Sequence, residues 1–136
     1  MPDPVFSGRP TLTAPKLRII RYAMLVMLLG FGAFAYYQPQ TPGPGDDHAN
    51  LGTLRLVGFA MCAGALVAIA VMRGVRAKAE PAARPTFALV GSAVGEGAAL
   101  FGAVYMLLGG DPLPYAIGIL LFLASWTLLP ADPEAT

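Results

Sequence analysis

Charged residues are scarce in this sequence. Only 12% of its 136 residues are Asp, Glu, Lys or Arg, whereas 56% are hydrophobic. Ordinary soluble domains carry about 25% charged residues, so this chain has too few charges to cover a surface that faces water. Its net charge of +1 gives no strongly basic surface, and we expect no nucleic-acid partner.

Residues that bind metals or carry out catalysis are also few. Cys62 is the single cysteine, so an intrachain disulfide is excluded. His48 is the single histidine. His48 follows Asp46 and Asp47, but a stable metal site usually needs three or four protein ligands, so we interpret this cluster as a solvated loop. The sequence also lacks a phosphate-binding glycine loop followed by Lys and Ser or Thr. We expect no metal, no cofactor and no catalysis by this chain alone.

Long apolar runs dominate the rest of the chain. They cover residues 17–37, 51–72, 86–110 and 113–130. Since a helix rises about 1.5 Å per residue, runs of about 20 residues can cross a hydrocarbon core of about 30 Å. The runs are apolar all round, whereas a helix of a soluble bundle keeps a polar face. Residues 17–130 are therefore predicted to form an all-α, antiparallel bundle of four transmembrane helices.

The segments outside these runs are polar or rich in proline. Residues 1–16 are predicted to form an extended tail, residues 38–50 and 73–85 polar loops, and residues 131–136 a short acidic tail. The first run could instead be a secretory signal that is cleaved near Ala33–Ala35. It is long for a signal core, and we favour a membrane span.

Lysine and arginine are distributed unevenly around the runs. Four of the nine Lys and Arg residues lie before the first run or in its first turns, and four lie between the second and third runs. Only Arg55 lies elsewhere. The positive-inside rule then places both termini in the cytoplasm, and we expect an integral protein of the inner (cytoplasmic) membrane. Four basic residues precede or begin the first run: Arg9, Lys16, Arg18 and Arg21. They could also touch anionic headgroups, as in a lipid- or peptide-binding adaptor. Basic residues beside a span more often set its topology.

Glu96 is the one carboxylate inside an apolar run. It is the eleventh residue of the third run, about 15 Å into the membrane by helical rise. An ionised carboxylate is costly at that depth, so we expect it to face other helices and to be protonated or paired. Small residues beside it, spaced by three or four, predict a close helix-packing face: Gly91, Gly95, Ala98 and Gly102.

Three roles are open for Glu96. Protonated, it could hydrogen-bond a backbone carbonyl or a hydroxyl of Ser92, Ser125 or Thr127 and so fix the helix register. It could instead form an ion pair with Arg55, drawn inward from the outer surface. The third role is reversible binding of a proton or cation.

A family resemblance bears on the third role. The stretch GEGAALFGAVYMLL, residues 95–108, resembles the carboxylate helix of the proteolipid rotor-ring subunits of F-type and V-type ATPases. In those subunits a glutamate is followed by alanine, an aliphatic residue, an aromatic residue and glycine, here Glu96, Ala99, Leu100, Phe101 and Gly102. The likeness covers residues 52–110 and implies that Glu96 is an ion-carrying carboxylate.

Such a short chain has little room for a substrate cavity of its own. We expect a non-enzymatic accessory or structural subunit, whose partners are the lipid bilayer and other transmembrane helices. It would pack laterally in a homo-oligomer or a larger membrane complex through the face of Gly91, Gly95 and Gly102. The alternative is proteolipid-like translocation of a proton or cation through Glu96.

Overall fold

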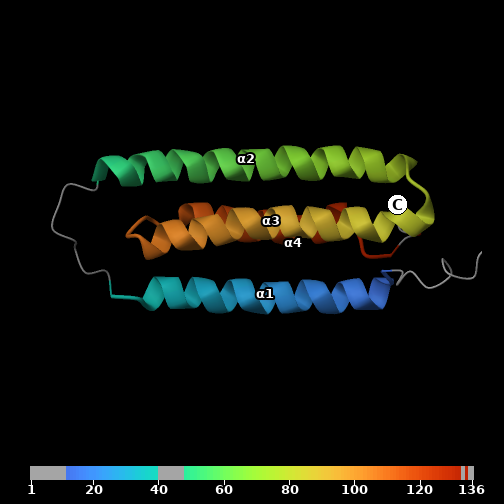
Figure 1. Cartoon of the computed structure of the whole chain (residues 1–136), viewed down its shortest axis with the longest axis horizontal. Helices are drawn as coiled ribbons and strands as arrows, with labels where there is room; N and C mark the ends of the chain where they lie inside the picture. The colour runs from blue at the N-terminus through green and yellow to red at the C-terminus, as the bar shows by residue number, and fades with distance from the viewer. Residues whose placement is uncertain (1–11, 40–47, 133, 135–136) are drawn as a thin grey trace, which may run out of the picture.

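The computed structural model describes residues 12–39, 48–132 and 134. These residues form helices and no strand, which confirms the predicted all-α class (Figure 1). In chain order the elements are α1 (Ala14–Tyr37), α2 (His48–Lys78), the short 3-10 helix η2 (Pro81–Ala83), α3 (Arg84–Leu107) and α4 (Leu113–Leu128).

The first helix begins earlier than the sequence predicts. We expected an extended tail over residues 1–16, but α1 starts at Ala14 and has Pro15 in its first turn. Proline is compatible with that position, because the first backbone N–H groups of a helix have no intrahelical acceptor. The predicted tail is therefore wrong for residues 14–16, and its first eleven residues lie outside the described part of the chain.

The second helix is longer than its apolar run at both ends. It begins at His48, within the predicted loop 38–50, and continues through the basic residues to Lys78, within the predicted loop 73–85. Arginine, lysine and alanine are good helix formers, so the helix extends beyond its apolar part. Asp46 and Asp47 lie outside the described residues.

A glycine turn ends α3 inside the predicted span 86–110. Gly109 has a φ of 98°, a left-handed conformation that glycine adopts readily. The N–H of Gly110 donates to the carbonyl oxygen of Tyr105 at 3.0 Å, and the N–H of Gly109 to that of Met106 at 3.1 Å. This pair of bonds is the Schellman motif, and it turns the chain back towards α4.

Within the described residues, α1, α2 and α3 are long and apolar enough to cross a membrane. The fourth helix has 16 residues, or about 24 Å at 1.5 Å per residue. This is shorter than a hydrocarbon core of about 30 Å and shorter than the predicted span 113–130. The fourth membrane crossing thus stays a prediction.

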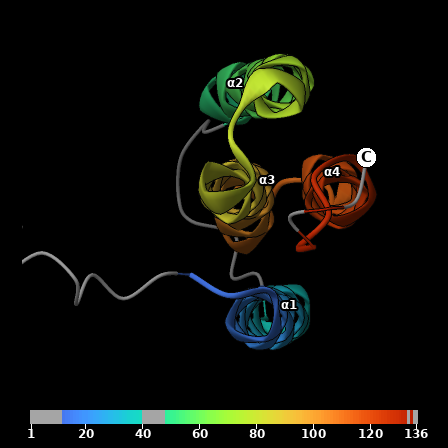
Figure 2. The same ribbon diagram turned by 90° about the vertical axis from the view of Figure 1, so that its right-hand side faces the viewer.

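Helix α3 is the centre of the bundle. Viewed end-on, α3 and α4 lie side by side, and α1 and α2 lie on opposite sides of α3 (Figure 2). The contact between α3 and α4 is the most extensive in the described chain. Any polar group on α3 is therefore either covered by one of three neighbouring helices or left on the open side of the bundle.

The exterior of the bundle is apolar. Large side chains on α1 and α2 are more than two-thirds exposed, for example Val26 at 69%, Met27 at 72% and Leu56 at 70%. Contiguous apolar surface of this kind is unfavourable in water but suits a lipid environment. The exposed apolar faces, on helices of spanning length, are those of an integral membrane protein.

Candidate functional site

Glycines of α3 allow α4 to approach backbone against backbone. A Cβ atom built on Gly95 would lie 2.7 Å from the Cα of Phe122, and one built on Gly102 would overlap with the backbone of Tyr115. Contacts this close leave no space for a methyl group. The predicted helix-packing stripe is thus used inside the chain.

The rest of the stripe is covered too. A Cβ on Gly91 would overlap with the Leu129 side chain next to α4, and Ala98 is buried with Cys62 of α2. We predicted that the glycines of this stripe contact another chain. That prediction is wrong, because α4 of the same chain occupies the face.

Glu96 lies at the edge of this packed region. It is near the middle of α3 and half-buried. In the described ranges, no hydrogen bond or ion pair joins its carboxyl group to another residue. A polar group in a membrane span normally has a partner, so Glu96 stands out as incompletely satisfied by its own chain.

The four side chains that we considered as partners of Glu96 have other contacts. Ser92 and Ser125 contact a buried arginine cluster. Arg55 pairs with an aspartate, and the Thr127 hydroxyl donates to the backbone of its own helix at 2.9 Å. Each of these groups is engaged away from the carboxyl group.

Arg21 of α1 forms the most buried polar cluster in the described structure. Its side chain is only 3% exposed. Its Nε donates to Ser92 Oγ at 2.9 Å, and its Nη2 donates to the carbonyl oxygens of Leu129 at 2.6 Å and Ala88 at 3.1 Å. The guanidinium also lies 5.9 Å from the ring centroid of Trp126, within cation–π range. A single side chain thus joins α1 to α3 and to the end of α4.

Two serines complete this cluster. Ser92 Oγ donates to the carbonyl oxygen of Ala88 at 2.9 Å, and Ser125 Oγ donates to that of Phe122 at 2.6 Å. The two hydroxyl oxygens are 3.4 Å apart. Both hydroxyl protons therefore have acceptors, and Ser92 can accept from Arg21 at the same time.

The role of Arg21 was not predicted, because we interpreted this residue as a charge that sets topology. A signal was nevertheless present. Arg21 lies one turn deeper in its run than Arg18, and Ser92 and Ser125 are the only serines of the four runs. Polar residues at matching depths on different spans predict an interhelical hydrogen-bond cluster.

Arginines from two helices bind the C-cap of α4 and the segment that follows it. Arg21 of α1 donates to the Leu129 carbonyl, and Nη2 of Arg76 in α2 donates to the carbonyl oxygens of Pro130 at 3.2 Å and Asp132 at 2.8 Å. The last carbonyls of a helix lack intrahelical donors and carry partial negative charge. Leu129 is the C-cap residue of α4, whereas Pro130 and Asp132 lie in the segment after the helix. The two arginines thus tie the end of α4 to α1 and the following segment to α2.

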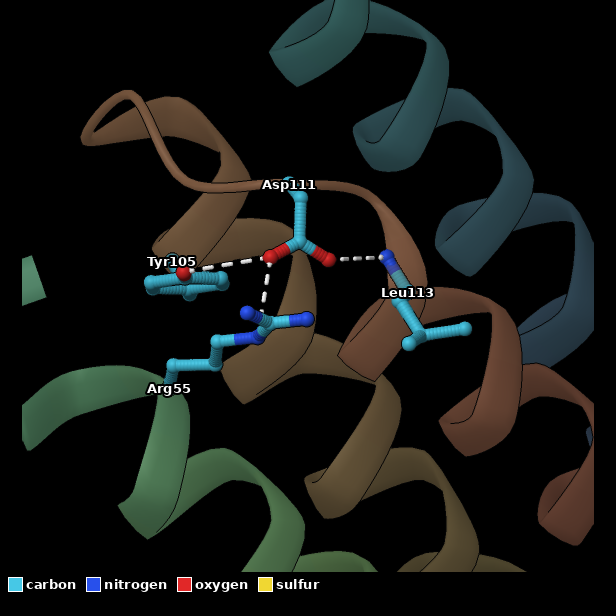
Figure 3. Close-up of polar contacts among 4 residues, drawn as sticks. All are labelled: Arg55, Tyr105, Asp111 and Leu113. Carbon is cyan, nitrogen blue, oxygen red and sulfur yellow. Dashed lines mark hydrogen bonds and ion pairs between the residues drawn. The ribbon is translucent and has the colours of Figure 1, made fainter. Parts of the chain in front are cut away.

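The other end of α4 has a second polar cluster (Figure 3). Arg55 Nε lies 3.2 Å from Asp111 Oδ2, and the Tyr105 hydroxyl donates to the same oxygen at 3.4 Å. Asp111 Oδ1 accepts from the N–H of Leu113 at 3.0 Å. A carboxylate is favourable at a helix N-terminus. Arg55 thus fixes the beginning of α4 by way of Asp111.

Neutralising Asp111 should lower stability by a small, defined amount. Asp111→Asn keeps an acceptor for Leu113 but removes the ion pair with Arg55. Both partners are partly exposed, so we expect a loss of about 0.5–1 kcal/mol in thermal unfolding of the purified chain in detergent. Arg55→Gln should give the same loss, and the double variant no more. Additive losses would contradict a direct pairing.

The stretch that resembles rotor subunits lies on α3 between three neighbouring helices. Its Ala99 and Gly102 are buried, while Leu100 is 38% exposed, so Glu96 sits where the buried and open faces of α3 meet. The resemblance rests on sequence alone and stays a prediction. No family model, no curated protein and no solved structure matches the chain.

Proposed function

We propose that this protein is a non-enzymatic accessory subunit of a membrane assembly. In this proposal it is an antiparallel bundle that crosses the inner membrane four times, with both termini in the cytoplasm. The observation that carries the proposal is Glu96, a half-buried carboxyl group near the middle of α3 for which the described chain supplies no polar partner. A neighbouring subunit would supply that partner.

The open face of α3 beside Glu96 suits such a contact. Ala93, Leu100 and Val104 are exposed there, and they are spaced so that they share one side of the helix. Gly97 lies among them, and a Cβ built on it has nothing within 4 Å. Ala93 and Gly97 form a small residue pair four apart, which lets another transmembrane helix approach closely. This face replaces the buried glycine stripe as the proposed lateral interface.

A leucine at Gly97 should test this interface. Because the space around Gly97 is open, Gly97→Leu should leave the fold of the single chain intact but block a close helix contact. We expect the assembly extracted in mild detergent to fall to monomer size in size-exclusion chromatography with light scattering. Gly64→Leu on α2 is the matched control, since a Cβ on Gly64 also has nothing within 4 Å. A wild-type chain that is already monomeric would contradict the proposal, as would equal effects of the two variants.

Translocation of a proton or cation is the second candidate function. It is favoured by the same carboxyl group, because no internal hydrogen bond in the described residues holds its proton in place. Glu96→Gln is expected to abolish ion flux in proteoliposomes while the assembly stays intact, since the amide retains hydrogen-bonding capacity but cannot ionise. If the wild type shows no flux and the variant fails to assemble, Glu96 serves assembly alone.

A further inference from the structure

A cavity of about 230 Å³ lies beside the Arg21 cluster, where α1 begins and α4 ends. Two arginines and two aromatic residues of α1 and α4 line it, and the segment after α4 completes its wall: Arg18, Arg21, Tyr22, Trp126, Pro130, Ala131 and Asp132. Arg18 and Tyr22 are exposed on the outside of α1. Exposed side chains of α1 thus border the cavity.

Two hydrogen-bond donors of the lining residues make no hydrogen bond within the described chain. Arg21 donates hydrogen bonds to described residues through Nε and Nη2. Its Nη1 donates none to them. Trp126 Nε1 is buried and has no acceptor within the described ranges. A buried donor without an acceptor is unfavourable. Trp126 Nε1 is covered by protein atoms, so an acceptor that enters the cavity would be bound by the arginines.

The charges around the cavity favour an anion. Arg18 and Arg21 line it, and Arg76 is near enough to Arg21 to add to the positive field. Asp132 contributes the one opposing charge among the lining residues. It lies near Arg76, whose guanidinium interacts with it electrostatically, so the cavity as a whole is cationic.

We propose that this cavity binds the phosphate group of an anionic phospholipid. Arginine is suited to phosphate oxygens, and basic pockets between transmembrane helices bind anionic headgroups. Tyr22, Trp126 and Pro130 form an apolar wall that fits the glycerol and the first acyl carbons. The exposed position of Arg18 and Tyr22 gives a lipid lateral access, so the lipid headgroup is the source of the phosphate rather than the free ion.

The single tryptophan of the chain, Trp126, reports on this site directly. The probe is dioleoylphosphatidylglycerol brominated on its acyl chains, titrated into the purified protein in neutral detergent, with brominated phosphatidylcholine as the zwitterionic comparison. We expect saturable quenching of Trp126 fluorescence at lower concentrations of phosphatidylglycerol. Arg18→Gln should raise the half-saturating concentration about fivefold. Inorganic phosphate without lipid should leave the fluorescence unchanged.

Lys16→Gln is the matched control. It removes the same charge from the same helix, but Lys16 is exposed and does not line the cavity. Equal weakening by Lys16→Gln and Arg18→Gln would show a diffuse surface effect and overturn the proposal. Equal quenching by both lipids would overturn it as well. A saturable response to inorganic phosphate alone would contradict a lipid as the natural ligand.

Discussion

Gly102→Ala should strongly destabilise the bundle. The added methyl group would overlap with the backbone of Tyr115 in α4, and a backbone cannot move aside as the end of a flexible side chain can. Since α3 and α4 form the most extensive contact in the described chain, separating them affects the whole bundle. Overpacking of this kind costs about 3 kcal/mol. Unfolding of the purified protein in detergent, followed by circular dichroism during a titration with sodium dodecyl sulfate, measures the loss.

Gly64→Ala provides the comparison for this prediction. Gly64 also lies within a helix, and a methyl group there has nothing within 4 Å. Alanine is a better helix former than glycine by about 1 kcal/mol, so this variant should be as stable as the wild type or more stable. If Gly102→Ala behaved like Gly64→Ala, the close packing of α3 against α4 would be refuted.

Arg21→Leu is the second substitution with a large expected effect. It keeps an apolar side chain on α1 but leaves the carbonyl oxygen of Leu129 without its donor and removes a hydrogen bond from Ser92. Each buried polar group without a partner costs about 1–3 kcal/mol, so we expect a loss of about 3 kcal/mol in the same titration. The fluorescence of Trp126, which the guanidinium overlies, should also change.

Two further variants separate this role from charge alone. Arg21→Lys keeps the charge but offers one ammonium group where the guanidinium reaches three acceptors, so it should restore only part of the stability. Lys16→Leu removes a nearby exposed charge and should change stability by less than about 0.5 kcal/mol. A wild-type stability for Arg21→Leu would mean that Arg21 does not hold the helices together.

The helices could be predicted from the sequence, because each apolar run is long enough, at the rise of a helix, to cross a membrane. The ends of the helices were less predictable. Pro15 and the basic end of α2 were interpreted as breaks, although proline suits a first turn and arginine favours helix. The end of α3 depends on the left-handed conformation of Gly109, and the sequence does not specify which of the adjacent Gly109 and Gly110 adopts it.

The partners of the polar side chains could be predicted only in part. Glu96 drew attention because a carboxylate within a span is rare, but which helix covers the glycines beside it depends on the packing of the whole bundle. Arg21 was missed since an arginine near the start of a span usually sets topology. Its burial depends on the acceptors that α3 and the end of α4 bring together around it.

The apolar faces of α1 and α2 must meet lipid if the protein is an integral membrane subunit. Extraction of native membranes with alkaline sodium carbonate tests that requirement most directly, because it releases peripheral and soluble proteins and leaves integral ones in the bilayer. The full-length chain should stay in the membrane pellet and enter solution only with detergent. Its release into the carbonate supernatant would contradict the account.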